Sequence, residues 1–149
     1  VVSTVKPNVK RMFGKAAYVL STLAALMSFR FPKYRVRVDG ETFDVASAVI
    51  ANGHFYGGTF VCARDARLDD PTLQVVLFLR RGVWPTIRYA VWLALGRLEK
   101  LPDVKIVPAT DIEVERVDAG PVQGDGDILA HLPARITLAP AALALMMPA

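Results

Sequence analysis

Two carboxylates, Asp125 and Asp127, lie one residue apart in the glycine-rich segment 120–127. Carboxylates placed in this way can serve as a general base or as ligands of a hard cation. The glycines beside them allow a tight turn and let a ligand approach the backbone closely. Taken alone, the pattern favours a solvated turn over a site, because Asp-Gly is a common tight-turn pair.

A second group of carboxylates lies in the loop at 64–71, directly before an apolar segment at 73–79. Asp69 and Asp70 end this loop, and hard cations accept carboxylate and carbonyl oxygens as ligands. One hypothesis is therefore an oxygen-ligand cation site. The structural alternative is a polar loop that closes a strand pair and needs no ligand.

The order carboxylate, glycine, carboxylate also occurs at Asp39-Gly40-Glu41. Apolar and polar residues alternate over 34–38, and a second strand-like segment follows at 42–51. An Asp-Gly pair between two such segments predicts a β-hairpin. The three-residue pattern therefore says little without its surroundings.

The other residues with chemical potential favour structural roles. The glycine-rich loop at 52–59 lacks the Gly-Lys-Ser/Thr of a P-loop and opens no helix, so it is not a nucleotide fingerprint. His54 and His131 have no further ligand at zinc spacing, which argues against a zinc hydrolase. Cys62 has apolar neighbours and is expected in the core rather than as a nucleophile.

The composition predicts one folded, mildly basic domain. The chain has 149 residues, 53% hydrophobic and 21% charged, which is enough for one sizeable core. The net charge of +4 and the pI near 9.5 suit anionic partners such as phosphates or a membrane surface. Aromatic residues are not interleaved with a dense basic stripe, so no nucleic acid is expected as a partner. A single cysteine excludes an internal disulfide framework and permits a reducing compartment.

Two helices and about eight short strands are expected to position the candidate residues. Helical spacing of apolar residues predicts helices over 9–29 and 82–100. Strand-like segments lie at 34–38, 42–51, 60–63, 73–79, 104–108, 110–117, 128–132, 134–138 and 143–147. The predicted fold class is α+β, mainly β, with a β-sandwich-like arrangement rather than alternating βαβ units.

The predicted helix at 82–100 is apolar almost all round. One stripe holds Trp84, Ile87, Val91, Leu95 and Leu98, and Tyr89, Trp92 and Leu93 make much of the rest apolar too. Such a helix is either buried or in contact with an apolar partner. Core packing is the favoured interpretation. Interfacial membrane contact is the alternative, because basic residues flank the aromatic ones: Arg80, Arg81, Arg88, Arg97 and Lys100.

Three segments resemble, in order, the signatures of one family. They are Val49-Ile50-Ala51-Asn52-Gly53 with Tyr56-Gly57-Gly58, then Ala66-Arg67-Leu68-Asp69-Asp70 with Leu73-Gln74-Val75, then Val122-Gln123-Gly124-Asp125-Gly126-Asp127. The segments 132–136 and 143–148 are similar to the same family's last strands. Together they resemble the diacylglycerol kinase catalytic family, in particular the bacterial lipid kinases related to sphingosine kinases.

That family has two domains. An N-terminal α/β domain carries a Gly-Gly-Asp-Gly-Thr loop that binds nucleotide, and a C-terminal β-sandwich domain has the NAD kinase/diacylglycerol kinase-like fold. No Gly-Gly-Asp-Gly-Thr occurs in this sequence. The resemblance therefore implies that residues 1–149 are a single domain, the C-terminal substrate-side domain of a lipid kinase, with the nucleotide-binding domain absent.

The resemblance also implies roles for individual residues. Asp125 matches the general base that acts on the lipid hydroxyl, and Asp127 matches an acidic residue that is usually glutamate. Asp70 matches the aspartate of a magnesium site, in which the backbone carbonyls of Arg67 and Thr72 join it. Asn52 matches a recurrent asparagine near the domain cleft and is the candidate for nucleotide binding.

The implied function is that of an ATP-dependent lipid kinase, which transfers the γ-phosphoryl group to the hydroxyl of diacylglycerol or of a sphingoid-type lipid. Mg²⁺ is the implied cofactor, and ATP is the co-substrate, bound through the missing N-terminal domain. This fragment alone is expected to be inactive. The expected location is the cytoplasm, peripheral to the inner face of the membrane, and a homodimer is compatible with the sequence.

Two alternatives stay open at this point. One is a non-catalytic lipid- or membrane-binding β-sandwich module, which the apolar helix at 82–100 and its basic flanks support. The other is an NAD-kinase-like enzyme domain. The same helix argues against this second alternative, because a soluble substrate would suit a less apolar surface.

Overall fold

The computed structural model describes residues 31–56, 58–115, 120–124 and 127–139. The chain divides into two compact units, Val1–Phe31 and Pro32–Ala149, and the elements below belong to the second. The predicted helix at 9–29 and the predicted strand at 143–147 lie outside the described residues.

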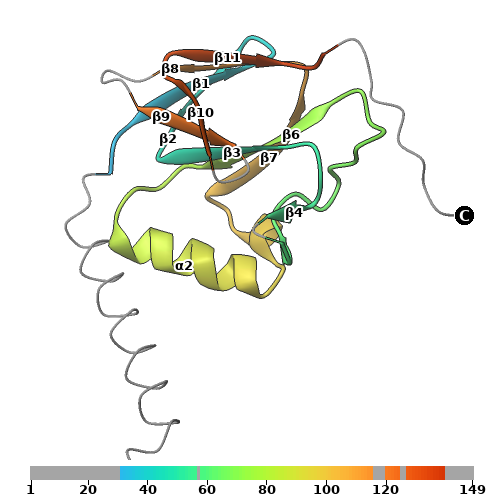
Figure 1. The fold of residues 1–149 in the computed structure, drawn as a ribbon. Helices are drawn as coiled ribbons and strands as arrows, with labels where there is room; N and C mark the ends of the chain where they lie inside the picture. The colour runs from blue at the N-terminus through green and yellow to red at the C-terminus, as the bar shows by residue number, and fades with distance from the viewer. Residues whose placement is uncertain (1–30, 57, 116–119, 125–126, 140–149) are drawn as a thin grey trace, which may run out of the picture. The chain divides into compact units, whose positions relative to one another are not determined.

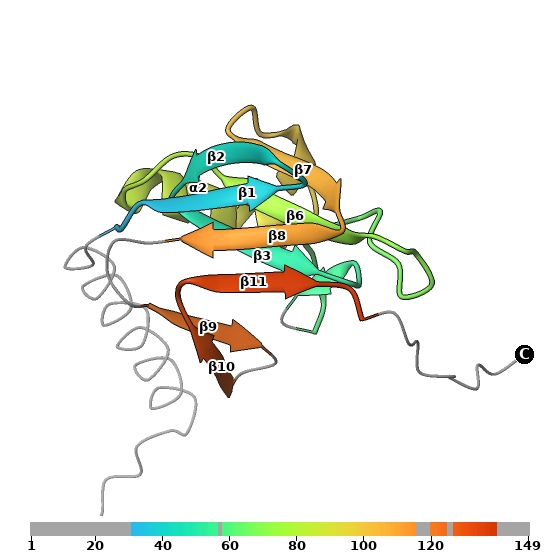
Figure 2. The same ribbon diagram turned by 90° about the horizontal axis from the view of Figure 1, so that it is seen from above.

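Four antiparallel strands form one sheet in the order β11-β8-β1-β2 (Figure 2). They are β1 (Tyr34–Val38), β2 (Glu41–Val45), β8 (Asp111–Glu115) and β11 (Ala134–Thr137). Side chains alternate between the two faces of a strand. One face is buried and consists of Val36, Val38, Phe43, Val45 and Ile112. The other face carries cross-strand ion pairs, such as Arg37 with Glu113 at 2.8 Å.

Three antiparallel strands form a second sheet in the order β3-β6-β7. They are β3 (Ser47–Ala51), β6 (Leu73–Phe78) and β7 (Val104–Ala109). Every residue of the central strand β6 is buried. The apolar segment at 73–79 predicted this strand, because a strand covered on both faces needs apolar side chains on both.

Two cores lie on the two faces of β6, a strand that Figure 1 draws between the four-stranded sheet and α2. Val75 and Leu77 pack with the buried face of the four-stranded sheet. Val76 and Phe78 pack on the opposite side, against Tyr89 of α2 (Val83–Ala94) and Leu98 of the short 3₁₀ helix η1 (Leu98–Lys100). Sheet, sheet and helix therefore form three layers. For the described residues this confirms the predicted mainly-β, sandwich-like fold.

Two small hairpins complete the described structure. β4 (Phe55–Tyr56) pairs with β5 (Phe60–Val61), and β9 (Pro121–Gly124) pairs with β10 (Asp127–His131). Among the described strands, β9 and β10 pair only with each other. Figure 2 shows this hairpin beyond β11, clear of the four-stranded sheet. Pro121–Gly124 had been predicted as part of a turn, and that prediction is wrong.

The predicted strand at 42–51 is two strands. β2 ends at Val45 and β3 begins at Ser47, so the chain leaves one sheet and enters the other at Ala46. The Ala46 N–H donates to the carbonyl of Phe78 on β6, at 2.7 Å. The residues from Val45 to Ala51 are apolar apart from Ser47, with no turn signal between them, and for that reason the sequence pattern did not reveal the crossing.

The predicted helix at 82–100 ends at Ala94, and η1 follows it as a separate turn. Gly96 adopts a φ of +63°, and its N–H donates to the carbonyl of Leu93 at 3.0 Å. Glycine tolerates this left-handed conformation, which commonly terminates helices. Pro85 lies in the first turn of α2, where its missing N–H removes no intrahelical hydrogen bond.

The apolar stripe named from the sequence of this helix faces outward over most of its length. Trp84, Val91 and Leu95 are exposed, whereas Tyr89 is buried and Trp92 and Leu93 pack on the core. Of the predicted stripe only Leu98, which lies in η1, is fully buried. Because apolar residues occupy most positions around the helix, spacing alone does not tell which stripe packs on the core.

Asp39 and Gly40 form the predicted hairpin turn between β1 and β2. Their φ values are +44° and +94°, the left-handed pair that two-residue hairpin turns require. The Asp39 carboxylate also accepts hydrogen bonds from the backbone N–H groups of Asp111, at 2.9 Å, and of Thr110, at 3.1 Å. The residue is therefore a structural anchor that ties this hairpin to the start of β8.

We expect Asp39→Asn to reduce the acid sensitivity of the fold. The N–H donors of Asp111 and Thr110 lower the pKa of Asp39 below its usual 3.8. A lowered pKa means that the carboxylate stabilises the fold above its ordinary pKa and that this contribution is lost as the pH falls through the folded-state pKa. The variant should thus be less stable at neutral pH, and the difference should shrink below about pH 4.

Urea unfolding at a series of pH values measures this difference. Asp65→Asn serves as the control, because Asp65 is exposed and has no side-chain hydrogen bond to a described residue. Asn at position 39 keeps the left-handed turn accessible, so the test isolates the charge. A constant stability difference between Asp39→Asn and the native chain across this pH range would contradict the assignment.

Candidate functional site

The β9–β10 hairpin carries the motif at 122–127. Gly124 at the end of β9 pairs with Asp127 at the start of β10. Asp125 and Gly126 lie outside the described residues, so the predicted base is located only by these flanking strands. A Cβ added at Gly124 would overlap the Leu129 side chain, which lies against the glycine. Glycine at this position therefore leaves room for β10 to fold back on β9.

Asp127 is an exposed residue at the first position of β10. Its carboxylate makes no hydrogen bond or ion pair with another described side chain, so it is open to a ligand from solvent. At the base of the hairpin the Leu132 N–H donates to the Gly120 carbonyl at 2.8 Å. The structure thus presents the acidic end of the hairpin outward.

The three predicted magnesium ligands lie together in one turn before β6. One oxygen of Asp70, Oδ1, accepts hydrogen bonds from the Thr72 N–H at 3.0 Å and from Thr72 Oγ1 at 2.8 Å. The Asp70 N–H faces the Arg67 carbonyl at 3.3 Å. Two hydrogen bonds of 2.9 Å join the Arg67 guanidinium to Asp69 instead, and they lower the pKa of the Asp69 carboxyl.

This donor set fits a hydrated Mg²⁺ ion. Mg²⁺ is commonly bound through one or two carboxylates and retains several waters. Asp70 supplies one half-buried carboxylate whose Oδ2 has no hydrogen bond to a described residue, and carbonyl oxygens lie in the same turn. Over the described ranges, no group of three or more His, Cys, Asp or Glu side chains could hold a metal ion. A site here therefore depends on Asp70, carbonyls and water.

Asn52 lies at the same end of the three-stranded sheet as this turn. It follows Ala51, which pairs with Gln74 on β6, two residues after Thr72. The adjoining loops are joined by a bond from the Cys62 N–H to the His54 carbonyl, at 2.9 Å. The structure therefore brings Asn52 and the Asp70 turn to one sheet end. No described contact links either of them to the β9–β10 hairpin.

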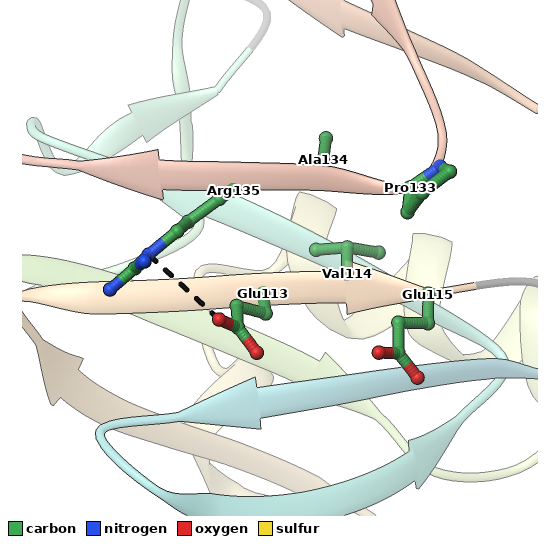
Figure 3. A pocket seen from close by; sticks show the side chains of 6 residues that line it. All are labelled: Glu113, Val114, Glu115, Pro133, Ala134 and Arg135. Carbon is green, nitrogen blue, oxygen red and sulfur yellow. Dashed lines mark ion pairs between the residues drawn. The ribbon is translucent and has the colours of Figure 1, made fainter.

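A shallow hollow of about 290 Å³ lies elsewhere, between β8 and β11 (Figure 3). Its lining residues are Glu113, Val114, Glu115, Pro133, Ala134 and Arg135. Arg135 is already paired with Asp111 at 2.6 Å and lies 3.8 Å from Glu113. None of the predicted site residues lines this hollow, and its charged groups are balanced by their strand neighbours. It does not fit a polyphosphate, because Arg135, the cation among its lining residues, is already paired with Asp111, and Glu115 adds a negative charge.

The sequence reasoning missed a polar network beneath α2. Asp103 is buried, with a side-chain exposure of 8%, and it forms an ion pair with Arg88. Its Oδ2 also accepts a hydrogen bond from the Tyr89 hydroxyl at 2.7 Å, and that hydroxyl accepts one from the Arg80 N–H at 3.1 Å. Burial and the Asp103 hydrogen bond raise the pKa of Tyr89. The signal in the sequence was one aspartate between an apolar helix that holds one arginine and an apolar strand.

Three further expectations concern residues outside the site. Cys62 is buried, as predicted, and burial raises the pKa of its thiol to about 11, so it stays protonated. His54 lies in a loop and His131 in β10, which agrees with structural roles. None of the helices in the described part of the chain has the length and apolarity to cross a bilayer.

Comparisons with known proteins extend over almost the whole chain. The family described as "YegS C-terminal NAD kinase beta sandwich-like domain" matches residues 1–147. The diacylglycerol kinase of Mycobacterium tuberculosis (strain CDC 1551 / Oshkosh) is 28% identical over 138 residues, which cover 91% of this chain and 44% of that protein. A Bacillus subtilis (strain 168) protein with the provisional name lipid kinase YtlR is 29% identical over 129 residues, covering 85% and 42%.

The fold has a counterpart among solved structures. The crystal structure of a diacylglycerol kinase from Bacillus anthracis str. Sterne aligns with a TM-score of 0.59 and 22% identity, over 88% of this chain and 45% of that one. At this identity the likeness concerns the fold alone. The chain spans less than half the length of the curated relatives that it matches.

Proposed function

Because the chain belongs to the YegS C-terminal NAD kinase beta sandwich-like domain family, we propose that it is the substrate-side part of an ATP-dependent lipid kinase. The observation that carries the proposal is the similarity to a protein named diacylglycerol kinase along 91% of this chain. The substrate class that we propose is a lipid with a free hydroxyl, of the diacylglycerol or sphingoid type.

In the proposed reaction, Asp125 accepts the proton of the lipid hydroxyl. The hydroxyl oxygen then forms a bond to the γ-phosphorus of ATP, the bond between that phosphorus and the bridging oxygen breaks, and ADP leaves. Phosphoryl transfer depends mainly on positioning and on stabilising charge. A proton acceptor on an exposed hairpin suits a substrate whose hydroxyl lies at the end of a long apolar chain. Asp127, two residues further along the chain, would hold or orient the same hydroxyl.

Mg²⁺ would be held by Asp70 together with the carbonyls of Arg67 and Thr72. When bound, it would supply a fixed positive charge and hold ordered water at this end of the three-stranded sheet. The Asp70 turn is already fixed without the ion, because Thr72 donates two hydrogen bonds to one carboxylate oxygen. The second carboxylate oxygen is thereby left in position for a ligand.

ATP would come from the part of the longer protein that this chain does not contain. The sequence has no Gly-Gly-Asp-Gly-Thr or P-loop segment, and the hollow at Glu113 and Glu115 is acidic. Asn52 is exposed at the sheet end beside the Asp70 turn, where it could contact nucleotide held by a second domain. We therefore propose an active site shared between two domains.

A comparison of the full-length protein with the isolated chain tests the function. With γ-labelled ATP, Mg²⁺ and diacylglycerol in mixed micelles, the full-length protein is expected to form labelled phospholipid, and the 149-residue chain none above background. Label transfer by the isolated chain would contradict the two-domain site. Lipid binding by the full-length protein without any transfer to diacylglycerol or sphingoid bases would instead support the non-catalytic module.

A further inference from the structure

The outer face of α2 is apolar and uncovered among the described residues. Trp84, Val91 and Leu95 are 81%, 50% and 62% exposed, and at helical spacing they form one stripe. Ala90 and Ala94 beside them are exposed too. Single exposed apolar residues are ordinary on a soluble protein, whereas a continuous stripe marks a contact surface.

This face also lacks the charged residues of an ordinary surface helix. Arg88 is the only charged residue of α2, and its guanidinium pairs with the buried Asp103 instead of extending into solvent. The helix thus has an inner face that packs on β6 and an outer face that is equally apolar. Packing among the described residues explains the inner face but not the outer one.

Basic side chains stand at both ends of the stripe. Arg80 and Arg81 precede α2, Arg97 and Lys100 follow it, and all four are exposed. Between residues 80 and 103 the acidic residues are Glu99 and Asp103. Glu99 lies 3.7 Å from Arg64, and Asp103 is buried against Arg88. The exposed charge around the stripe is therefore positive.

We propose that the outer face of α2 docks on an anionic lipid bilayer. The stripe of Trp84, Val91 and Leu95 would enter the boundary between headgroups and acyl chains, with the helix parallel to the membrane plane. The four basic residues at its ends would face anionic headgroups. Interfacial helices combine the same two terms, buried apolar area and attraction of Lys and Arg to acidic lipid.

Charge complementarity favours this partner over other occupants. A second copy of the chain would bring the same positive ends to the contact, where like charges repel. The missing part of a longer protein would cover the stripe whether or not acidic lipid is present. The bilayer proposal therefore requires dependence on acidic lipid and on salt, which the other occupants do not.

Vesicle sedimentation of the 149-residue chain tests the proposal. Equal parts of phosphatidylglycerol and phosphatidylcholine are compared with phosphatidylcholine alone, without nucleotide, Mg²⁺ or diacylglycerol. We expect binding to the acidic vesicles that weakens at least tenfold between about 0.1 and about 0.5 M salt. Because no kinase reagent is present, this result is independent of the proposed catalytic function, and either proposal can fail alone.

Matched variants test whether binding depends on this stripe and its basic residues or on exposed apolar and basic residues in general. Arg81→Glu should weaken binding about tenfold or more, since each basic residue near the surface contributes about fivefold and the change removes one charge and adds an opposite one. Arg35→Glu makes the same charge change on the outer face of the four-stranded sheet and should have little effect. Leu95→Ser should weaken binding, whereas Ile128→Ser, at a residue that is 59% exposed on β10, should not.

Tryptophan fluorescence provides a second measurement that does not depend on the charge and stripe variants. Trp84 fluorescence, read in a Trp92→Phe background with its fold checked by circular dichroism, should shift to shorter wavelength on acidic vesicles. Equal binding to neutral vesicles, or equal losses in Arg81→Glu and Arg35→Glu, would overturn the proposal. A dimer of the native chain that dissociates in the Leu95→Ser variant would also overturn the proposal. Protection of Trp84 from soluble quenchers in the full-length protein without lipid would do the same.

Discussion

Turnover of lipid by the full-length protein is expected to fall by about 10²–10⁴-fold when Asp125 is replaced by Asn, because this is the range that general-base catalysis contributes. Asn keeps the size of the side chain and removes the proton acceptor. ATP affinity should change little, since the proposed nucleotide site lies on the other domain. The measurement is labelled phospholipid formed per unit time at saturating ATP, alongside ATP binding by calorimetry.

Asp127→Asn is the matched control for this experiment. It makes the same chemical change two residues away, on the same exposed hairpin, where Asp127 pairs with Gly124 through its backbone. Its proposed role is to hold the hydroxyl, so its effect should fall mainly on the apparent affinity for lipid. Near-normal turnover by Asp125→Asn, with the fold intact, would remove Asp125 from the role of base.

The second large effect is expected at Asp103, on stability rather than on chemistry. Asp103→Ala should lower the free energy of unfolding by about 2–4 kcal/mol, because it leaves the Arg88 guanidinium and the Tyr89 hydroxyl without their shared acceptor. The lower part of that range applies if Arg88 recovers water, since its side chain is 39% exposed. Urea unfolding with an unchanged slope measures the loss.

Asp44→Ala is the control for Asp103. It also removes one carboxylate from an ion pair with arginine, but Asp44 lies 3.7 Å from Arg35 and the two side chains are 72% and 61% exposed. Exposed pairs of this kind contribute about 0–1 kcal/mol. If the two variants unfold at the same urea concentration, Asp103 does not hold α2 in place.

The sequence was informative where one periodicity dominates. The alternation over 34–38 and the Asp39-Gly40 pair predicted the β1–β2 hairpin, and the apolar segment at 73–79 predicted the buried strand β6. The similarity of three ordered segments predicted a lipid kinase family, and the family match over residues 1–147 confirms it. In each case the sequence signal lies within one short segment or in the fixed order of a few short motifs.

The sequence was uninformative where a contact between distant segments decides which way a side chain faces or where a strand ends. Nothing in the spacing of α2 says that Tyr89 faces β6 and Trp84 faces outward, because both stripes are apolar. Asp103 acquires its role from Arg88 and Tyr89, more than a dozen residues earlier in the chain. The switch from β2 to β3 at Ala46 likewise depends on where the second sheet lies.

The candidate site likewise has a part that the sequence predicts and a part that depends on tertiary pairing. Arg67, Asp70 and Thr72 are close in sequence, and the structure places them in one turn. Asn52 reaches the same sheet end only through the pairing of Ala51 with Gln74. The assignment of Asp125 rests on the resemblance alone, because Asp39-Gly40-Glu41 has a similar pattern and serves as a turn and anchor.

The hairpin β9–β10 has a consequence for how such a domain can evolve. Its strands pair with no other described strand, and all five residues of β10 are exposed. Mutations in this hairpin, apart from Gly124, change few core contacts and so reduce the free energy of unfolding only slightly. If the proposed base lies on this hairpin, its approach to other acceptor alcohols can therefore change while the buried layers stay the same. A catalytic residue on such a hairpin, as proposed for Asp125, would allow the substrate to change without a prior gain in stability.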